Sequence, residues 1–425
     1  YNKDWTKIYS GGTFTLIPNT EADTNIRVGQ TYQNAPQTVW ANINQLISFY
    51  GRLNYMFDDT YLLTFTLRND GTSRFSKNNR WSLFPALALG WKINNMPFME
   101  RSQGWLNEFK LRLGWGQTGQ QDVGQYFPYL PIYINSYQNN YQYLDPSGTG
   151  EWINPLYPQA YNPDLKWETT TTWNVGIDMG FLNNRITLAA DWYYRKTTDL
   201  LSYVPTASMM TSNKMWRNIG SMTNTGIDID LNAAIYKSKD WYVGVRTNMN
   251  YNKNKVTELF NGKTSYPMPN YLTSYEIGKS VGQFYMVEYA GVDPTDGKQM
   301  WVDCNGNLTK TFNEERDAKV MNKSQYAPLS GGFGFDLRWK DLSLRTDFAW
   351  QGKKYLVNND LMFIRNAANA TSINQMVEML NVWTKPGDIT DIPGPGEEVQ
   401  FDTRFLENAS FLRMKNVTLQ YSLPR

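Results

Sequence analysis

The sequence contains no histidine and a single cysteine, and these absences exclude several common kinds of site. Without histidine there is no imidazole base for a catalytic triad and no ligand set for the usual zinc and iron sites. Cys304 alone cannot form a disulfide framework within the chain or a cysteine-rich zinc site. The side chains available for catalysis are therefore carboxylates.

Long hydrophobic runs are also missing. No segment approaches the roughly 18 to 20 consecutive apolar residues that a membrane-spanning helix requires, which excludes a helical membrane protein. A strand of a membrane β-barrel needs only about 9 to 11 residues, half of them facing a polar interior, so a barrel stays open. The 41 basic and 39 acidic residues nearly cancel, which gives no reason to expect nucleic acid or an anionic membrane surface as a partner.

Aromatic residues are abundant, since Tyr, Phe and Trp make up 15% of the 425 residues. Many lie where apolar and polar residues alternate, as in 173–181, where Trp173, Val175 and Ile177 are separated by Asn174 and Gly176. This alternation predicts a strand with one apolar and one polar face. About eleven long strands show it, near residues 47–56, 61–67, 81–93, 109–115, 173–181, 186–195, 227–235, 241–251, 333–339, 342–350 and 411–423.

The connections between these strands alternate in length. Short turns such as 182–184 and 340–341 are interleaved with long loops, which lie at 118–168, 197–217, 252–329 and 352–410. In an antiparallel meander, alternate connections lie at the same end of the sheet, so one end carries nearly all the loops. Bacterial outer-membrane barrels have this asymmetry, with tight periplasmic turns and long outer loops.

A soluble β-sandwich or propeller also alternates, with its apolar face turned inward. Two features favour the barrel. The strands are longer than the usual five or six residues of a soluble sheet. Aromatic residues such as Trp241 and Tyr251 stand near the ends of the apolar faces, as girdles at two lipid interfaces require. The predicted fold class is an all-β, transmembrane antiparallel β-barrel.

Several motifs resemble the barrel of SusC/RagA-type TonB-linked outer-membrane transporters. They include RNDGTSRFSKNNRWSLFPALALGW (68–91), FKLRLGWGQTGQ (109–120), NPDLKWETTTTWNVGID (162–178), NRITLAADWYYRKTTDLL (184–201), NIGSMTNTGIDIDL (218–231) and NASFLRMKNVTLQYSL (408–423). The resemblance covers most of the chain from about residue 47 onward. Gln120 departs from the asparagine usual after Thr-Gly, and Asp228 stands where glutamate is common.

The resemblance implies energised import across the bacterial outer membrane. Members of the family form a 22-stranded barrel around an N-terminal plug, bind TonB from the periplasm and carry a SusD-type surface lipoprotein. Their cargo is typically an oligosaccharide or an oligopeptide. Because this sequence has no recognisable plug or TonB-binding segment, we expect it to be part of a longer or split polypeptide, with residues 1–46 as an outer loop region and 47–425 as barrel surrounded by outer-membrane lipid.

Candidate cargo contacts lie in two places. The loop 118–168 is rich in aromatic residues, which suit sugar rings or extended peptides, a lipoprotein interface, or packing within the loop. The candidates there are Tyr126, Tyr129, Tyr137, Tyr141, Trp152 and Tyr157. On the polar faces of the strands, which would face a water-filled lumen, the candidates are Asp178, Asp191, Asp228, Asp230, Arg246 and Arg338.

Two further hypotheses come from the acidic residues. The segment 293–307 has oxygen donors that suit calcium, but it lacks the closing glutamate of an EF-hand and also matches ordinary turn chemistry. Its candidate ligands are Asp293, Asp296, Asp303, Asn305 and Asn307. Asp228 and Asp230 are about 7 Å apart on one strand face, a spacing that an inverting glycosidase could use. A glycan-degrading enzyme, or a soluble or surface glycan-binding β-protein, is therefore the alternative to a non-enzymatic importer.

Overall fold

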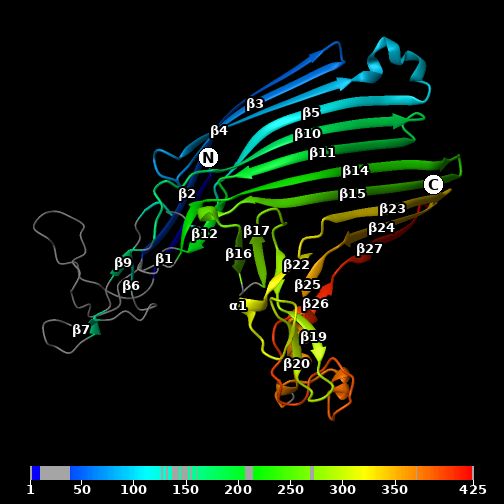
Figure 1. Cartoon of the computed structure of the whole chain (residues 1–425). Coiled ribbons are helices and arrows are strands. Elements are labelled where there is room, and N and C mark those ends of the chain that lie inside the picture. Colours follow the sequence, from blue (N-terminus) through cyan, green and yellow to red (C-terminus); the bar gives the residue numbers. More distant parts are fainter. Residues whose placement is uncertain are drawn as a thin grey trace, which may run out of the picture.

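The computed structural model describes residues 2–9, 39–125, 128–130, 133–135, 143–144, 152–153, 156–158, 160–205, 214–268, 272–369 and 371–423. Its main feature is a twisted antiparallel sheet of twelve strands, in which each strand pairs with the next sheet strand along the chain (Figure 1). In order, these strands are β1 (Asn2–Tyr9), β2 (Val39–Phe57), β3 (Tyr61–Thr72), β4 (Trp81–Lys92), β5 (Leu106–Gln120), β10 (Glu168–Phe181), β11 (Ile186–Thr198), β14 (Ser221–Lys237), β15 (Trp241–Glu258), β23 (Leu329–Trp339), β24 (Leu342–Gly352) and β27 (Phe411–Tyr421). All eleven predicted strands are confirmed.

The sheet begins earlier than the sequence pattern predicts. Strand β2 begins at Val39, and β1 pairs with it from Asn2↔Leu46 to Tyr9↔Val39. The expectation that 1–46 forms an outer loop region is therefore wrong for 2–9 and 39–46. The odd positions of β1 mix Lys3 and Lys7 with Trp5 and Tyr9, and the even positions are mostly polar, so the period-two pattern could not reveal this strand.

One end of the sheet carries tight turns. The connection between β10 and β11 has positive φ at each of residues 182–184, between 52° and 58°, and the connection at 340–341 has φ 51° at Lys340. The wider connection between β4 and β5 holds two short 3-10 helices, η1 (Ile93–Asn95) and η2 (Pro97–Ser102). The predicted asymmetry between the two ends is thus confirmed.

The opposite end carries structured loops rather than open coil. Between β5 and β10 along the chain are β6 (Tyr133–Asn135), β7 (Tyr143–Leu144), β8 (Trp152–Ile153) and β9 (Leu156–Pro158), and a hairpin of β12 (Leu201–Pro205) with β13 (Lys214–Asn218) follows β11. The connections after β15 and β24 form one projection (Figure 1). It contains η4 (Phe260–Gly262), β16 (Ser265–Met268), β17 (Thr273–Glu276), β18 (Gln283–Met286), β19 (Glu288–Val292), β20 (Gln299–Val302), β21 (Leu308–Thr309), α1 (Glu314–Asp317), β22 (Lys319–Ser324), β25 (Tyr355–Val357), α2 (Asn359–Ile364), η6 (Ala367–Asn369), η7 (Val377–Asn381), η8 (Thr403–Phe405) and β26 (Leu406–Asn408).

A small hydrophobic core lies at the loop end of the sheet. It contains Phe75, Phe84, Val123, Leu165 and Trp167, with Phe75 and Leu165 fully buried. The Trp167 ring lies 5.8 Å from Phe75 and 5.5 Å from Phe84 between centroids, and its indole N–H donates to the Arg80 carbonyl at 3.0 Å. Residues from two of the sequence motifs, 68–91 and 162–178, thus pack against one another.

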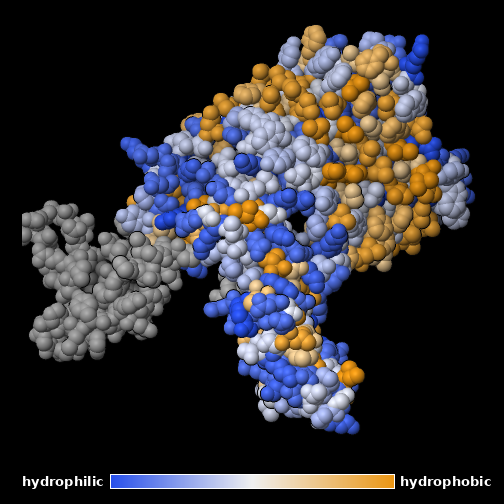
Figure 2. Space-filling view, in the orientation of Figure 1, coloured by the Kyte–Doolittle hydropathy of each residue, from blue (hydrophilic) through white to orange (hydrophobic). Residues whose placement is uncertain are grey.

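The apolar face of the sheet is exposed from β2 to β27. Figure 2 shows a hydrophobic band over the strands and hydrophilic loops below it. Aromatic pairs stand near both margins, for example Trp241 beside Trp339 at the turn end and Phe49 beside Trp81 at the loop end, each with centroids 6.0 Å apart. Trp241 and Tyr251 are about 34 Å apart along β15, or about 26 Å along the membrane normal for a strand tilted by about 40°. This height matches the hydrocarbon layer that an outer-membrane barrel spans. No helix in the described ranges is long and apolar enough to cross a membrane.

A lysine pair on β15 tests this face assignment. Val245 lies on the apolar face midway between Trp241 and Tyr251, and Asn248 lies on the polar face of the same strand. We expect Val245→Lys to destabilise the complete protein by about 2–4 kcal/mol in lipid, because the ammonium loses its hydration. Asn248→Lys should change stability by less than about 0.5 kcal/mol. Urea unfolding in lipid vesicles measures both, and equal losses would contradict the assignment.

Candidate functional site

The polar face of the sheet gathers all six predicted strand residues. Cross-strand pairing places Asp191 opposite Asp228 and Asp228 opposite Asn250, while the neighbours Trp192, Ile227 and Tyr251 point to the apolar face. The same register puts the others on this face: Asp178 on β10, Asp230 on β14, Arg246 on β15 and Arg338 on β23.

Arg112 on β5 joins two of these residues. Its guanidinium donates to Asp178 through Nε and Nη2, at 2.9 and 2.8 Å, and to Asp191 through Nη1 and Nη2, both at 2.8 Å. One cation on β5 is therefore shared by carboxylates on β10 and β11, and each contact is a charge-assisted hydrogen bond.

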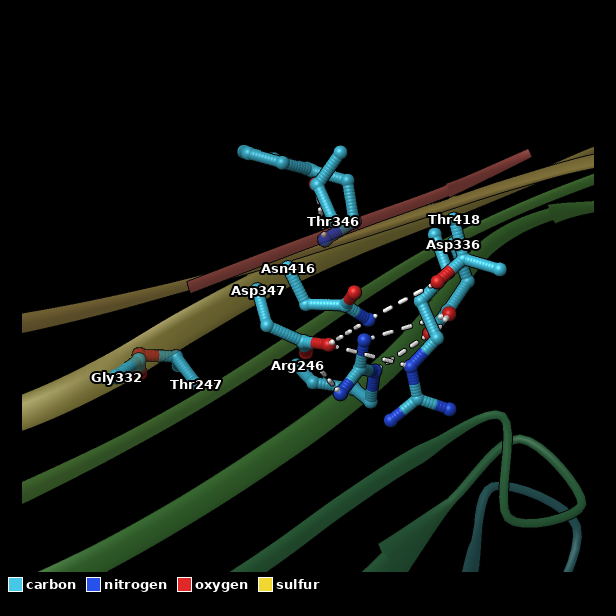
Figure 3. A network of polar contacts seen from close by, with 10 residues as sticks. Arg246, Thr247, Gly332, Asp336, Thr346, Asp347, Asn416 and Thr418 are labelled. Carbon is cyan, nitrogen blue, oxygen red and sulfur yellow. Dashed lines mark hydrogen bonds and ion pairs between the residues drawn. The ribbon is translucent and has the colours of Figure 1, made fainter. Parts of the chain in front are cut away.

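Arg246 on β15 makes an equivalent cluster. Its Nε donates to Asp336 at 2.6 Å and its Nη1 lies 3.0 Å from Asp347. The Asn416 amide donates to the far oxygen of Asp347 at 3.5 Å. Figure 3 shows these side chains on one side of the ribbon, with Thr346 on the other. The predicted Arg246 is thus tied to carboxylates on the next two strands, β23 and β24.

The two clusters have the same backbone register. In each, an arginine faces a glycine on the middle strand, the glycine faces an aspartate on the third strand, and the second aspartate lies two residues after the glycine. The first set is Arg112, Gly176, Asp191 and Asp178; the second is Arg246, Gly334, Asp347 and Asp336. A Cβ on Gly176 would lie 2.7 Å from Arg112 Cζ, and one on Gly334 would lie 2.8 Å from Arg246 Nη2. Glycine is required because the guanidinium crosses directly over it.

A third Gly-x-Asp segment carries a neutral version of the crossing. Tyr193 extends from β11 over Gly226, and its hydroxyl donates to Asn252 Oδ1 on β15 at 3.2 Å. Asn250 in turn donates to Asp228 Oδ1. No cation pairs with Asp228 among the described residues, so this part of the polar face differs from the two arginine clusters.

Asp228 and Asp230 border a polar hollow of about 280 Å³. Asp191, Asn248, Asn250 and Ser330 complete its polar lining. Asp230 accepts from Asn232 at 2.6 Å and, like Asp228, has no ion-pair partner among the residues that the structure describes. The carboxylates can accept hydrogen bonds from a polar ligand in the lumen, and the amides can both donate and accept them.

A second and larger cavity, of about 690 Å³, lies at the loop end. Tyr203 and Trp216 of the β12–β13 hairpin form one wall, with ring centroids 5.3 Å apart. Phe260 and Tyr266 form the other wall, at 4.9 Å. The sequence indicated neither wall, because the two pairs come from different loops and meet only in the folded chain.

The aromatic candidates of the loop after β5 are placed only in part. Tyr126, Tyr137 and Tyr141 lie outside the described residues. Trp152 and Tyr157 belong to β8 and β9, of which the structure describes the backbone, and Tyr129 is half-buried. Contact of these residues with a ligand stays a prediction.

The acidic loop after β19 satisfies its carboxylates with protein donors. The Lys310 ammonium lies 2.6 Å from Asp293 and 3.0 Å from Asp296, and it holds the pKa of both carboxyl groups below the ordinary range. Asp303 instead accepts from the backbone N–H groups of Asn305 and Asn307, which forms an ordinary turn. No group of three or more acidic, histidine or cysteine side chains able to hold a metal occurs among the described residues. Calcium here stays a prediction that the geometry does not support.

A buried ion pair joins the two loops of the projection. Arg404 donates to Asp402 at 2.6 Å and to Gln299 at 2.7 Å, and its guanidinium carbon lies 3.8 Å from the Tyr289 ring centroid. Asp402 also accepts from the Trp301 indole at 2.9 Å. Burial raises the pKa of Tyr289 to about 12, so its hydroxyl stays protonated and donates to the Asp391 carbonyl at 3.1 Å. The projection is therefore a folded unit.

Comparison with known proteins gives consistent results. The family model described as TonB dependent receptor-like, beta-barrel matches residues 1–370. The TonB-dependent receptor SusC of Bacteroides thetaiotaomicron is 37% identical over 411 residues, which cover 91% of this chain and 38% of SusC. A TonB-dependent receptor of Formosa agariphila is 27% identical over 409 residues, 91% of this chain and 39% of that receptor. A structure of the RagAB peptide transporter superposes with a TM-score of 0.81 at 36% identity, covering 93% of this chain and 43% of that one. The chain thus spans about two fifths of the length of these relatives.

Alanine at the crossing glycines tests the arginine clusters. We expect Gly176→Ala and Gly334→Ala each to destabilise the complete protein by about 1–3 kcal/mol, because the added Cβ displaces a guanidinium from its carboxylates. Gly114→Ala is the matched control, since its Cβ would make an ordinary 3.6 Å contact with Asn174 Cβ on the same polar face. Urea unfolding in lipid vesicles gives the free energies. A loss for Gly114→Ala as large as for the other two would refute the crossing mechanism.

Proposed function

The chain belongs to the TonB dependent receptor-like β-barrel family and is of the SusC/RagA type, and on this premise we propose that it forms about half the wall of an outer-membrane importer. The observation that carries the proposal is the division of the twelve-stranded sheet into an apolar face with aromatic margins and a polar face with clustered charges. Since open sheet edges do not persist in lipid, β1 and β27 would join further strands of a barrel of about 22 strands.

The proposed activity is TonB-dependent uptake of an oligosaccharide or an oligopeptide. Cargo of this size is too large to diffuse through a porin and needs an energised, gated path. The polar hollow beside Asp228 and Asp230, the charged residues Arg246 and Arg338, and the aromatic loop after β5 are the proposed contact regions. The RagAB relative is described as a peptide transporter, which supports an oligomeric nutrient as cargo.

The proposed partners are TonB, reached through a region outside this chain, and a SusD-like surface lipoprotein. Support for the lipoprotein comes from an apolar patch on the projection formed by Val377, Leu380 and Ile389, residues that are 81%, 84% and 96% exposed. The Thr390 hydroxyl donates to the Asn381 carbonyl at 2.6 Å, which holds the segment of Ile389 beside η7. Apolar side chains gathered at a surface are typical of a protein interface.

The proposed function includes no hydrolysis. Asp228 and Asp230 each accept a hydrogen bond from an asparagine amide, and the relatives are receptors. We therefore expect bound cargo to remain unhydrolysed both with the unchanged protein and with Asp228→Asn.

Uptake by whole cells tests the importer. Cells that produce the complete protein should accumulate labelled oligomers above the size limit of porins, and a protonophore should abolish accumulation while leaving surface binding in place. This split is expected because TonB draws on the proton gradient for transport and not for binding. Cells with the gene deleted provide the control, and accumulation that continues unchanged after the protonophore would contradict the proposal.

Charge placed on the projection tests the lipoprotein interface. We expect the double variant Val377→Glu with Leu380→Glu to reduce the lipoprotein that copurifies in mild detergent by at least about tenfold, since two carboxylates would lose hydration in the contact. Leu308→Glu is the control, because Leu308 is also exposed (65%) on another part of the same projection. Peptide mass spectrometry quantifies the partner, and equal recovery from all variants would exclude this patch as the interface.

A further inference from the structure

The 690 Å³ cavity opens on the polar face of the sheet, at the loop end where a cargo molecule would enter. Its floor is Met222 on β14 and Val256 on β15, paired with each other and in phase with the polar-face residues Asp228 and Asn250. The hairpin β12–β13 stands on one side and the segment from η4 to β17 on the other. The cavity is therefore part of the rim of the lumen rather than of the lipid-facing surface.

The lining of this cavity is apolar. Nine of its 21 residues are aliphatic and six are aromatic. Only four of the others have a polar side chain: Ser202, Glu258, Thr273 and Gln325. The hydroxyl groups of a sugar placed among aliphatic side chains would lose their bonds to water without gaining partners, which costs free energy. A leucine, phenylalanine or similar side chain would instead gain from burial.

The charged groups at the cavity are already engaged within the protein. The Glu258 carboxylate accepts from the Ser221 hydroxyl at 3.1 Å. The Lys263 ammonium lies over the rings of Phe260 and Tyr266, at 5.1 and 5.6 Å from their centroids. Neither group requires a charged ligand to complete its environment, so the cavity selects by shape and apolar contact.

The polar hollow lies further along the same strand face. Met222 in the cavity and Asp228 in the hollow are six residues apart on β14, or about 20 Å. An extended peptide covers this distance with about six residues. Such a chain presents apolar side chains together with amide groups, and the two sites offer surfaces of those two kinds.

We infer that the cavity receives an apolar side chain of an oligopeptide and that the cargo is a peptide of about six residues or more rather than a glycan. This inference rests on the proposed importer function and specifies its substrate class. Tyr203 is a ligand-contacting residue in it, because its ring forms the more exposed part of one wall, with 48% of the residue accessible.

Calorimetric titration of the complete receptor, purified from its own outer membrane, tests the inference with three probes: a heptapeptide with one terminal phenylalanine, the same peptide with serine there, and maltohexaose. The phenylalanine peptide should bind about 10- to 100-fold more tightly than the serine peptide. Shortening it to three residues should lower affinity by at least about tenfold, because a tripeptide cannot span both sites.

Two independent variants locate the effect. Tyr203→Ser removes part of a wall, and Leu259→Glu adds a carboxylate to the lining; both should reduce the preference for phenylalanine to less than about threefold. Phe363→Ala, at an exposed aromatic residue outside the cavity, should keep the full preference. Binding of maltohexaose that exceeds binding of both peptides, or a phenylalanine preference unchanged in both cavity variants, would overturn the inference while protonophore-sensitive uptake still upheld the importer. Absence of that uptake for peptide and glycan alike would overturn both.

Discussion

The backbone hydrogen bonds of the twelve-stranded sheet are the constraint on which the rest of the molecule depends. A peptide group that faces hydrocarbon has no water to bond, so every strand in the membrane must pair continuously with its neighbours. Continuous pairing in turn imposes the period of two, which sends Trp192 and Ile227 to lipid and Asp191 and Asp228 to the lumen. A shift of one residue in any strand would reverse these faces, so the register needs support beyond the backbone.

The arginine crossings provide such support from within the lumen. Arg112 and Arg246 each span three strands, and each depends on a glycine over which the guanidinium can lie. If one strand slipped by one residue, its aspartate would move to the apolar face and the arginine would lose that partner, which costs free energy for a partly buried cation. The same crossings neutralise much of the charge of the polar face. Asp228 and Asp230, which pair with no cation in the part of the chain that the structure describes, lie between them at the hollow proposed to contact cargo.

The loops after β15 and β24 extend this ordered structure beyond the membrane. The Arg404–Asp402 pair, enclosed by Trp301 and Tyr289, joins segments about a hundred residues apart and gives the projection a core of its own. A folded projection with a core of its own can present the Val377 and Leu380 patch to a partner. It also holds Phe260 and Tyr266 opposite the β12–β13 hairpin, so that the apolar cavity exists before a ligand arrives.

The sequence by itself determined which residues form the long strands, which face each side chain takes and which end carries the loops, because these follow from local alternation and turn length. Asp178, Asp191, Asp228, Asp230, Arg246 and Arg338 could be assigned to the polar face for that reason alone. The partners of those residues could not. Arg112 meets Asp178 because β5 and β10 pair across the whole 118–168 loop, and β1 enters the sheet through backbone bonds without an apolar face. The cavity walls likewise come from separate loops. Only the tertiary structure decided these features, because each depends on contacts between segments far apart in the chain, and local alternation does not show which segments meet.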